Sequence, residues 1–254
     1  MKIGYKTDKG KFRERNEDAY FVDQTKRLFI VADGMGGYQG GEIASHLAVQ
    51  TISKFLSPSS PASFLEKTSE RKELHKSVLK AIQQSIAEAN EEIHRKASEE
   101  SQLNGMGTTI VLALFCNDLV YISHVGDSRA YLIRNNTIKQ LTKDHSLVTE
   151  LIKKGVISKE EAQNHHLRNI ITRALGKEKD LKVDIIPLSY KKGDYLLLCT
   201  DGLTDVVEDE EIKDIILKAK EPVKACNRLV NSANRRGGKD NVTVIIIKMD
   251  EGGR

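Results

Sequence analysis

The chain of 254 residues has no tryptophan, only three cysteines and four prolines, and few aromatic residues. Its longest apolar run, Ile110 to Cys116, is far shorter than the ~18 residues that a membrane-spanning helix needs. The first residues, MKIGYKTDKGKF, include no apolar stretch of the kind that a secretory signal contains. We therefore expect neither a membrane span nor export through a signal peptide.

The scarcity of aromatic residues also removes the stacking surfaces of a protein that binds single-stranded nucleic acid. The 40 Lys and Arg residues barely exceed the 36 Asp and Glu residues, and both signs are interleaved along the chain. Nucleic acid is therefore not an expected partner. Cys116 and Cys199 lie in apolar runs and Cys226 on an expected helix, which indicates buried, reduced thiols in the cytoplasm. The absence of a Cys-x-x-Cys pair disfavours zinc.

Hydrophobic periodicity predicts runs of strands and pairs of helices. Strands are expected at 2–7, 19–23, 27–32, 108–116, 119–125, 129–133, 183–187, 195–199 and 242–248. Helices are expected at 42–56, 74–93, 208–219 and 222–236, and short helical segments at 147–154 and 159–164. A loop rich in Ser and Pro, 57–63, ends the first long helix. The three strands between 108 and 133 are joined by turn residues, so an antiparallel meander is expected there.

Strands that occur in runs, with helices in pairs, favour an α+β fold over a doubly wound parallel sheet. Two sheets packed face to face, with a helix pair outside each, would bury every apolar face found. We therefore predict a central antiparallel β-sandwich flanked by helix pairs, in four layers α-β-β-α. The length is close to the limit of one hydrophobic core, so residues 1–254 are expected to form a single domain.

Acidic residues recur where apolar strands end or begin. Asp33, Asp127 and Asp201 each follow an apolar strand, whereas the pair Glu17-Asp18 and Asp240 precede one. An Asp-Gly or Asp-Asn pair alone is a common turn, but five such positions on strand ends are expected to converge in one cleft. Clustered carboxylates repel each other unless a cation neutralises them, and oxygen ligands select hard ions. No EF-hand loop is present, so a binuclear Mg2+ or Mn2+ site is the favoured interpretation.

Such a site suits phosphoryl hydrolysis, because two metal ions can activate a bridging water and clamp the phosphoryl oxygens. Arg13, just before Asp18, is the candidate to hold the remaining negative charge with its planar donor fork. The glycine-rich loop 34–41 is not a nucleotide cradle, because it lacks the Gly-Lys-Ser/Thr of a P-loop and the sixth-position glycine of a dinucleotide fingerprint. Its glycines would instead let backbone carbonyls approach a metal held by Asp33.

Eight short motifs follow one another in the order found in the metal-dependent, type 2C Ser/Thr protein phosphatases. They are RERNED (13–18), DGMGG (33–37), GTT (107–109), VGDSR (125–129), TKDH (142–145), ITRALG (171–176), TDGL (200–203) and KDN (239–241). The chain resembles this family from residue 1 to 248, and its DGMGG form and compact length resemble the bacterial branch. The family fold, a β-sandwich flanked by helix pairs, agrees with the fold expected above.

The resemblance implies a set of metal ligands. Asp33 would bridge two Mn2+ or Mg2+ ions, and Gly34 would add its backbone carbonyl. Asp201 and Asp240 would bind one of these ions. Asp127, together with Asp201, would hold a third and weaker ion.

The resemblance also implies roles for residues around the ions. Arg13 would hold the phosphate of the substrate. Asp18, with Glu17 and Thr108, would orient metal-bound waters for catalysis. Residues 144–170, which we call the flap, would form a mobile segment over the site.

By the same resemblance, the chain would hydrolyse phosphoserine and phosphothreonine on proteins by direct attack of a metal-bridging water. It would oppose a Ser/Thr kinase, which is itself an expected partner, and act as a cytoplasmic monomer. The absence of a Cys-x5-Arg signature agrees with a mechanism without a phosphorylated residue. A pseudophosphatase that only binds phosphoproteins is the alternative, disfavoured because every expected metal carboxylate is present. A phosphatase dedicated to one small regulatory protein is a third reading.

The residue after Asp33-Gly34 is Met35. In animal-type members of the family this position is a histidine, which is thought to protonate the leaving alkoxide. A water on the third metal, positioned by Asp127, is our hypothesis for the acid. His145 has two interpretations, a substitute acid or a buried histidine that bonds the backbone at the start of the flap. His165 and His166 are expected to be solvated.

Replacing Asp127 by alanine tests this hypothesis. An aryl phosphate has a leaving group that needs no proton, whereas a serine or threonine alkoxide does. We therefore expect Asp127→Ala to lower kcat on a phosphopeptide by about 100-fold or more and on an aryl phosphate by about tenfold or less. Equal losses on the two substrates, measured under the same metal conditions, would contradict the hypothesis.

Overall fold

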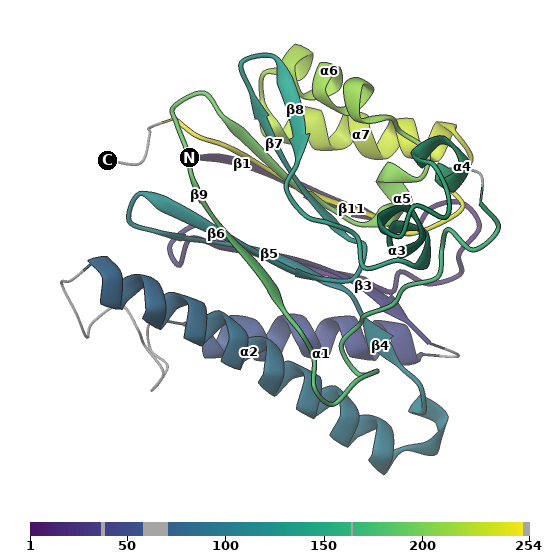
Figure 1. The fold of residues 1–254 in the computed structure, drawn as a ribbon. Coiled ribbons are helices and arrows are strands. Elements are labelled where there is room, and N and C mark those ends of the chain that lie inside the picture. The colour runs from purple at the N-terminus through teal and green to yellow at the C-terminus, as the bar shows by residue number, and fades with distance from the viewer. Residues whose placement is uncertain (37–38, 58–70, 164, 251–254) are drawn as a thin grey trace.

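The computed structural model describes residues 1–36, 39–57, 71–163 and 165–250. Four layers are stacked on one another: a helix pair, two antiparallel sheets and a second helix pair (Figure 1). This arrangement confirms the α+β class and the four-layer sandwich predicted from the sequence.

We call the two sheets the β1 sheet and the β2 sheet. In both sheets every pair of adjacent strands is antiparallel. The β1 sheet has the order β1 (Lys2–Asp8), β11 (Val242–Lys248), β10 (Tyr195–Cys199), β7 (Arg129–Arg134) and β8 (Thr137–Gln140). The β2 sheet has the order β2 (Asp18–Asp23), β3 (Leu28–Met35), β5 (Ile110–Cys116), β6 (Leu119–Val125) and β9 (Asp184–Ser189), with β4 (Gly107–Thr108) paired to β3.

Long helices cover the outer face of each sheet. The β2 sheet is covered by α1 (Gly40–Phe55) and α2 (Arg71–Glu99), and the β1 sheet by α6 (Asp209–Ala219) and α7 (Pro222–Arg235) (Figure 1). The shorter helices are η1 (Ser101–Leu103), α3 (Leu147–Lys153), α4 (Lys159–Gln163) and α5 (Asp201–Thr204).

Apolar side chains fill the space between the layers in three clusters. The cluster between the two sheets includes Phe29, Ile122, Leu198 and Ile245, all fully or almost fully buried. The other two clusters join each sheet to its helix pair. Strand β5 is buried on both faces, which explains why its sequence is an uninterrupted apolar run.

The two helices on the β2 sheet bury different kinds of face. Helix α2 buries Val78, Ile82 and Ile93 as the periodicity predicted. In α1 the predicted Ile52 is fully buried, but most of the other buried positions are small, among them Ala44 and Ala48, whereas Ile43, Leu47 and Phe55 are only partly buried beside them. Small side chains let this helix lie close to the sheet.

The predicted meander through 108–133 is wrong at its third strand. Strands β5 and β6 pair with each other, but β6 then pairs with β9, and β7 lies in the other sheet beside β10. The chain crosses between the sheets through residues 126–128. Gly126 allows this crossing because its φ is 106°, a backbone conformation that side chains with a Cβ rarely adopt. The crossing places Asp127 between the two sheets.

Smaller differences concern elements with weak sequence signals. The strand expected at 108–116 is divided into β4 and β5, because Thr109 between them donates its N–H to the carbonyl of Asp33. Strand β8 was not predicted, since its four residues are half exposed and carry no apolar pattern. Helices η1 and α5 were also not predicted. The predicted Ser/Pro loop lies, apart from Ser57, outside the described residues.

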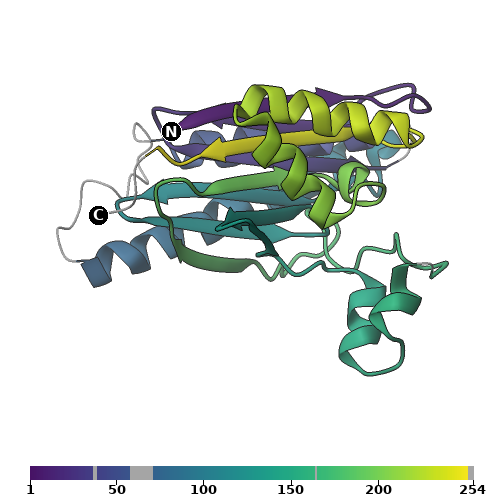
Figure 2. The ribbon, with the colours of Figure 1, turned by 90° about the horizontal axis from the view of Figure 1, so that it is seen from above.

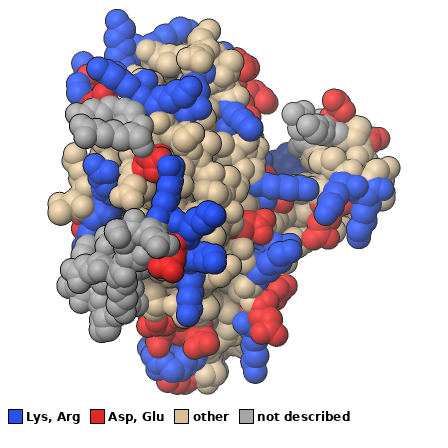
Figure 3. All heavy atoms as spheres, turned by 60° about the vertical axis from the view of Figure 1, so that its left-hand side comes forward, with Lys and Arg blue, Asp and Glu red and all other residues tan. Residues whose placement is uncertain are grey.

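The short helices α3 and α4 confirm the two helical segments expected in the polar stretch, and Figure 2 shows them standing away from the sandwich. On the face in Figure 3, Lys and Arg side chains lie among acidic and uncharged residues, without a continuous basic stripe. None of the helices in the described ranges combines the length and the apolar character that crossing a bilayer requires.

The crossing at Gly126 gives a stability prediction. A Cβ at Gly126 would lie 2.6 Å from Cγ2 of Thr109, whereas one at Gly193, whose φ is also positive at 90°, would contact nothing within 4 Å. Gly193→Ala should lower the free energy of unfolding by about 1 kcal/mol, through backbone strain alone. Gly126→Ala should lower it by about 2–4 kcal/mol, because overpacking adds to the strain. Denaturant unfolding of both variants measures the difference, and equal losses would contradict the steric argument.

Candidate metal centre

The five carboxylate positions predicted to converge do come together at one end of the sandwich. Asp18 and Asp33 face each other across the β2–β3 pair. Asp201 begins α5, with one residue between it and the end of β10, and Asp240 precedes β11, which is the neighbouring strand. Asp127 lies on the crossing between the sheets. The negative charges of Asp18, Asp127, Asp201 and Asp240 all raise the pKa of Asp33, so the five groups form one electrostatic unit.

Asp18 is the most buried of the five side chains. Its Oδ2 accepts hydrogen bonds from the hydroxyls of Thr243 and Thr200, at 2.6 and 3.0 Å. Its Oδ1 is buried without a partner. Burial raises the pKa of Asp18 to about 7, repulsion from Asp201 adds to the increase, and the threonine hydroxyls oppose it.

The other central carboxyl groups are perturbed in the same direction. Burial is the first cause at each, and it raises the pKa of Asp33 and of Asp127 well above the ordinary range. Burial, followed by the charges of Asp205 and Asp240, raises the pKa of Asp201 to about 6, against a hydrogen bond with Asp33 that lowers it. These groups would titrate as one coupled set, since each proton lost makes the next loss harder.

The donor atoms fit divalent cations. Within the described residues, Oδ1 of Asp18, Asp127 and Asp201 are all buried without a hydrogen-bond partner, although buried polar atoms are normally paired. Oxygen-only donors with surplus negative charge are what Mg2+ and Mn2+ prefer. A cation between these groups would supply the missing partner for each oxygen and lower the repulsion between the carboxylates.

Gly34 is required by close packing beside these carboxylates. A Cβ at this residue would lie 2.1 Å from the carbonyl oxygen of Gly41 and 2.5 Å from that of Glu17. The N–H of Gly34 donates to the carbonyl of Glu17 at 3.2 Å, and the hydroxyl of Ser45 donates to the same oxygen at 2.6 Å. The backbone at Asp33-Gly34 is therefore held by neighbours on two sides.

Arg13 lies at the rim of the cluster, where it forms an ion pair with Asp240. Its Nη2 donates to Oδ2 of Asp240 at 2.7 Å, and both side chains remain substantially exposed, at 51% and 38%. The hydrogen bond to Asp240 is the main reason that the pKa of Arg13 is raised. The ion pair holds the guanidinium next to the carboxylates while leaving part of it open to solvent.

Glu17 and Thr108 lie beside the cluster and differ in what their side chains contact. Burial is the first cause of the raised pKa of Glu17. The hydroxyl of Thr108 is fully buried and donates to the carbonyl of Asp33 at 2.8 Å. Thr108 thus contacts the backbone that carries Asp33.

Several supporting residues were missed by the sequence interpretation. Asn241 is buried, accepts the N–H of Glu17 with its Oδ1 at 2.7 Å, and donates to the carbonyls of Lys9 and Arg15, both at 2.9 Å. It therefore fixes the loop that carries Arg13. Thr109 accepts the N–H of Asp33 at 3.0 Å. Both lie within motifs of the family resemblance, KDN (239–241) and GTT (107–109), but no role was expected of them.

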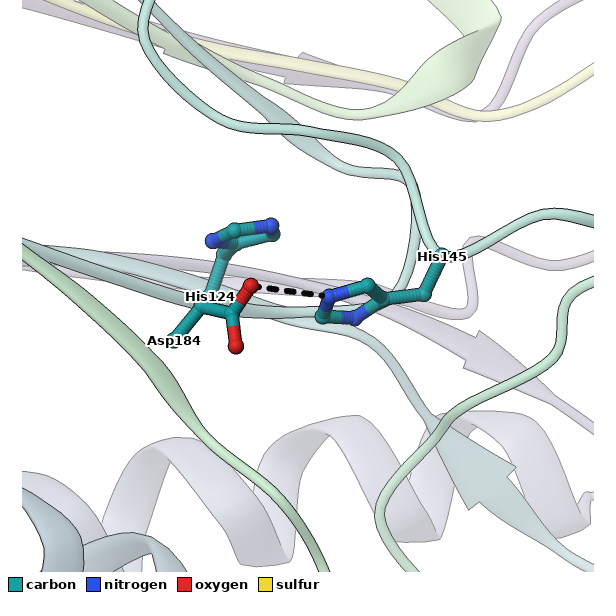
Figure 4. A group of neighbouring side chains, drawn as sticks. All are labelled: His124, His145 and Asp184. Atoms are coloured by element: carbon teal, nitrogen blue, oxygen red, sulfur yellow. Dashed lines mark hydrogen bonds and ion pairs between the residues drawn. The ribbon is translucent and has the colours of Figure 1, made fainter. Parts of the chain in front are cut away.

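His145 is buried beside His124 and Asp184, as Figure 4 shows. Its Nδ1 accepts the N–H of Gly126 at 3.1 Å, so the ring proton lies on Nε2, which faces Oδ2 of Asp184 at 3.4 Å. Burial lowers the pKa of His145 to about 4, so the ring is neutral. These bonds support the interpretation of a histidine that bonds the backbone.

The spacing of His124, His145 and Asp184 would also admit a metal ion. A cation is already there, however, because Nη1 of Arg173 lies 3.2 Å from Nε2 of His145 and 3.6 Å from Oδ1 of Asp184. We therefore do not assign a metal to this group. On the flap, the rings of His165 and His166 stack on each other; His166 is exposed as expected, whereas His165 is half-buried.

A cavity of about 470 Å3 lies between the carboxylates and the flap. Asp127 and Asp201 line it from the sandwich, and Val148, Ile152 and Arg168 line it from the flap. A phosphorylated side chain that entered this cavity would reach Asp127 and Asp201, whereas Arg13 and Glu17 line a different cavity.

The raised pKa of Asp18 predicts how stability depends on pH without metal. A buried carboxyl whose folded pKa is about 7 stabilises the fold below its ordinary pKa, and this stabilisation is lost as pH rises through 7. With a chelator present, Asp18→Asn should therefore exceed the parent in Tm at pH 8 by roughly 5 °C and show little advantage at pH 5. Thermal unfolding at both pH values measures this, and an Asn variant less stable than the parent at pH 8 would refute it.

Comparisons with known proteins agree with this geometry. The family described as protein phosphatase 2C matches residues 9–242. The serine/threonine phosphatase stp of Listeria welshimeri is 41% identical over 251 residues, covering 98% of this chain and 96% of that protein. The solved serine/threonine phosphatase PstP/Ppp of Mycobacterium tuberculosis is 33% identical with a TM-score of 0.86, covering 98% of both chains. The catalytic domain of PstP in complex with two manganese ions is 34% identical with a TM-score of 0.80, covering 96% of both chains. The chain belongs to the protein phosphatase 2C family and is a metal-dependent Ser/Thr protein phosphatase.

Proposed function

We propose that this phosphatase hydrolyses phosphoserine and phosphothreonine on proteins modified by a Ser/Thr kinase, and that the kinase itself is among its substrates. The observation that carries the proposal is the group of buried, mutually repelling carboxylates, with unpaired oxygens on Asp18, Asp127 and Asp201. Such a cluster is a binding site for divalent cations, and Arg13 supplies a donor fork for phosphate at its rim. The relative PstP was solved with two manganese ions, which supports Mn2+ or Mg2+ here.

Four of the five carboxylates have a proposed part in holding the ions. Asp33 would bind two of them, with the carbonyl of Gly34 as a further ligand, Asp201 and Asp240 would bind one of these, and Asp127 with Asp201 would hold a third, weaker ion. Bound cations supply an activated water and neutralise charge on the phosphoryl group. The close contacts around Gly34 support a backbone carbonyl as a ligand, because no side chain fits at this position.

The remaining residues orient the reactants. Asp18 is held by Thr200 and Thr243, so its unpaired Oδ1 has a fixed direction from which it can accept a hydrogen bond from water. Glu17 directly precedes Asp18, on the loop that carries Arg13. Arg13 binds the phosphate of the substrate, since part of its guanidinium stays exposed while Asp240 holds the rest. Thr108 acts through the backbone of Asp33.

The flap, residues 144–170, is proposed to contact the protein around the phosphorylated residue. Its side chains line the cavity beside Asp127, which supports this assignment. We further propose one catalytic domain over residues 1–254, acting as a monomer. The three cysteines are buried and free, which supports the cytoplasm as its compartment.

Hydrolysis of a phosphothreonine peptide with and without Mn2+ tests the proposal. Asp201→Asn should lower Mn2+-dependent turnover at least about 100-fold, because it removes a charged ligand while keeping the shape of the side chain. Asp214→Asn is the matched control, because Asp214 is exposed on α6 and pairs only with Lys218 among the described interactions. We expect it to retain the activity of the parent. Turnover without metal, or full activity in Asp201→Asn, would overturn the mechanism.

A further inference from the structure

The two ends of the flap meet at His145. The outgoing end continues to Ser146, whose hydroxyl caps the first turn of α3. The returning end is held because the N–H of Thr172 donates to the carbonyl of His145 at 2.7 Å, and the N–H of Leu147 donates to the carbonyl of Ile170 at 2.8 Å. Because these hydrogen bonds join the two ends of the flap at His145, a displacement of either end would move His145.

His145 also binds both backbone groups of Gly126. Its N–H donates to the carbonyl of Gly126 at 2.9 Å, and its Nδ1 accepts the N–H of Gly126 at 3.1 Å. The preceding residue, Asp144, holds Arg129 through two nitrogens, with the shortest contact at 2.7 Å from Nη2. The start of the flap therefore binds the crossing between the sheets on both sides of Asp127, at Gly126 and at Arg129.

The carboxylate of Asp127 depends on this backbone for its position. Its Oδ1 is buried without a partner, and the hydrogen bond that lowers its pKa comes from its own backbone. Among the described residues, no other side chain donates a hydrogen bond to this carboxylate. The direction of the side chain is therefore set by the conformation of residues 126–129.

We propose that His145 is a positioning residue that couples the flap to Asp127 and so sets the affinity of the cation that Asp127 holds. The inference rests on the proposed function, because it takes Asp127 to be a ligand of the weaker ion. Proton donation by His145 is a different role, and the geometry does not favour it. Nδ1 is occupied by Gly126, and Nε2 faces Asp184 and Arg173.

Two amide variants of similar size distinguish the effect of losing the hydrogen bond to Gly126 from the effect of changed packing. In His145→Asn, the side-chain oxygen lies close to the place of Nδ1 and can still accept the N–H of Gly126. In His145→Gln, the amide extends toward the place of Nε2, and that acceptor is lost. His46→Ala is a control for loss of a histidine, since His46 is exposed on α1.

Binding of Mn2+ is measured by calorimetry and by the electron paramagnetic resonance of the bound ion, on the full chain. We expect His145→Gln to weaken the weakest Mn2+ site about tenfold, as substitutions behind a ligand commonly do. His145→Asn should bind within about twofold of the parent, and His46→Ala should match it. The double variant of His145→Gln with Asp127→Ala should bind no more weakly than Asp127→Ala alone, because both changes act on one ligand.

The possible failures are distinguishable. If Asp127→Ala lowers Mn2+ binding and His145→Gln does not, the coupling is overturned while Asp127 remains a ligand. If His145→Gln and Asp127→Ala weaken Mn2+ binding additively, His145 acts on the protein by another route and the inference also fails. If Asp127→Ala itself leaves Mn2+ binding unchanged, the proposed third site is wrong and the inference falls with it.

Discussion

Repulsion between buried carboxylates is the constraint around which this end of the molecule is built. Five acidic side chains are brought together by strands from both sheets, and burial makes a negative charge on Asp18, Asp33, Asp127 or Asp201 more costly than it would be in water. The raised pKa values of Asp18 and Asp201 express this cost. A divalent cation relieves both the repulsion and the lack of hydrogen-bond partners. Metal affinity and folding stability therefore depend on the same interactions, so a substitution of one of these carboxylates changes the metal affinity and the folding stability.

The frame that holds the carboxylates is largely uncharged. Thr200 and Thr243 fix Asp18, Thr109 fixes the backbone of Asp33, and Asn241 fixes the loop that carries Arg13. Hydroxyl and amide groups hold these positions without adding a positive charge that would compete with a metal ion. Two arginines are exceptions. Arg13 pairs with Asp240 at the exposed rim rather than with the buried members of the cluster, and Arg129, beside Asp127, pairs with Asp144.

The sequence allowed the sandwich and its acidic end to be predicted because most strands are strongly apolar, and five of them end or begin near an acidic residue. The periodicity could not show which sheet a strand joins, so β7 was placed beside β6 although the crossing at Gly126 carries it to the other sheet. It also could not show that Arg13 pairs with Asp240, or which threonine faces Asp18, since these contacts join residues far apart in the chain. In α1 the large apolar residues suggested the buried face; Ile52 is buried as predicted, but close packing against the sheet places Ala44 and Ala48 there instead of Ile43 and Leu47. The roles of individual site residues remain predictions.

The last strand, β11, lies in the middle of its sheet, between β1 at the start of the chain and β10. Asp240 and Asn241 directly precede it, and Thr243 within it holds Asp18. During synthesis, neither β1 nor β10 can complete its pairing before β11 leaves the ribosome. Contacts of such long sequence separation form late and slowly. The nascent chain therefore carries its acidic segments apart, and the metal centre comes into existence only after β11 has been made.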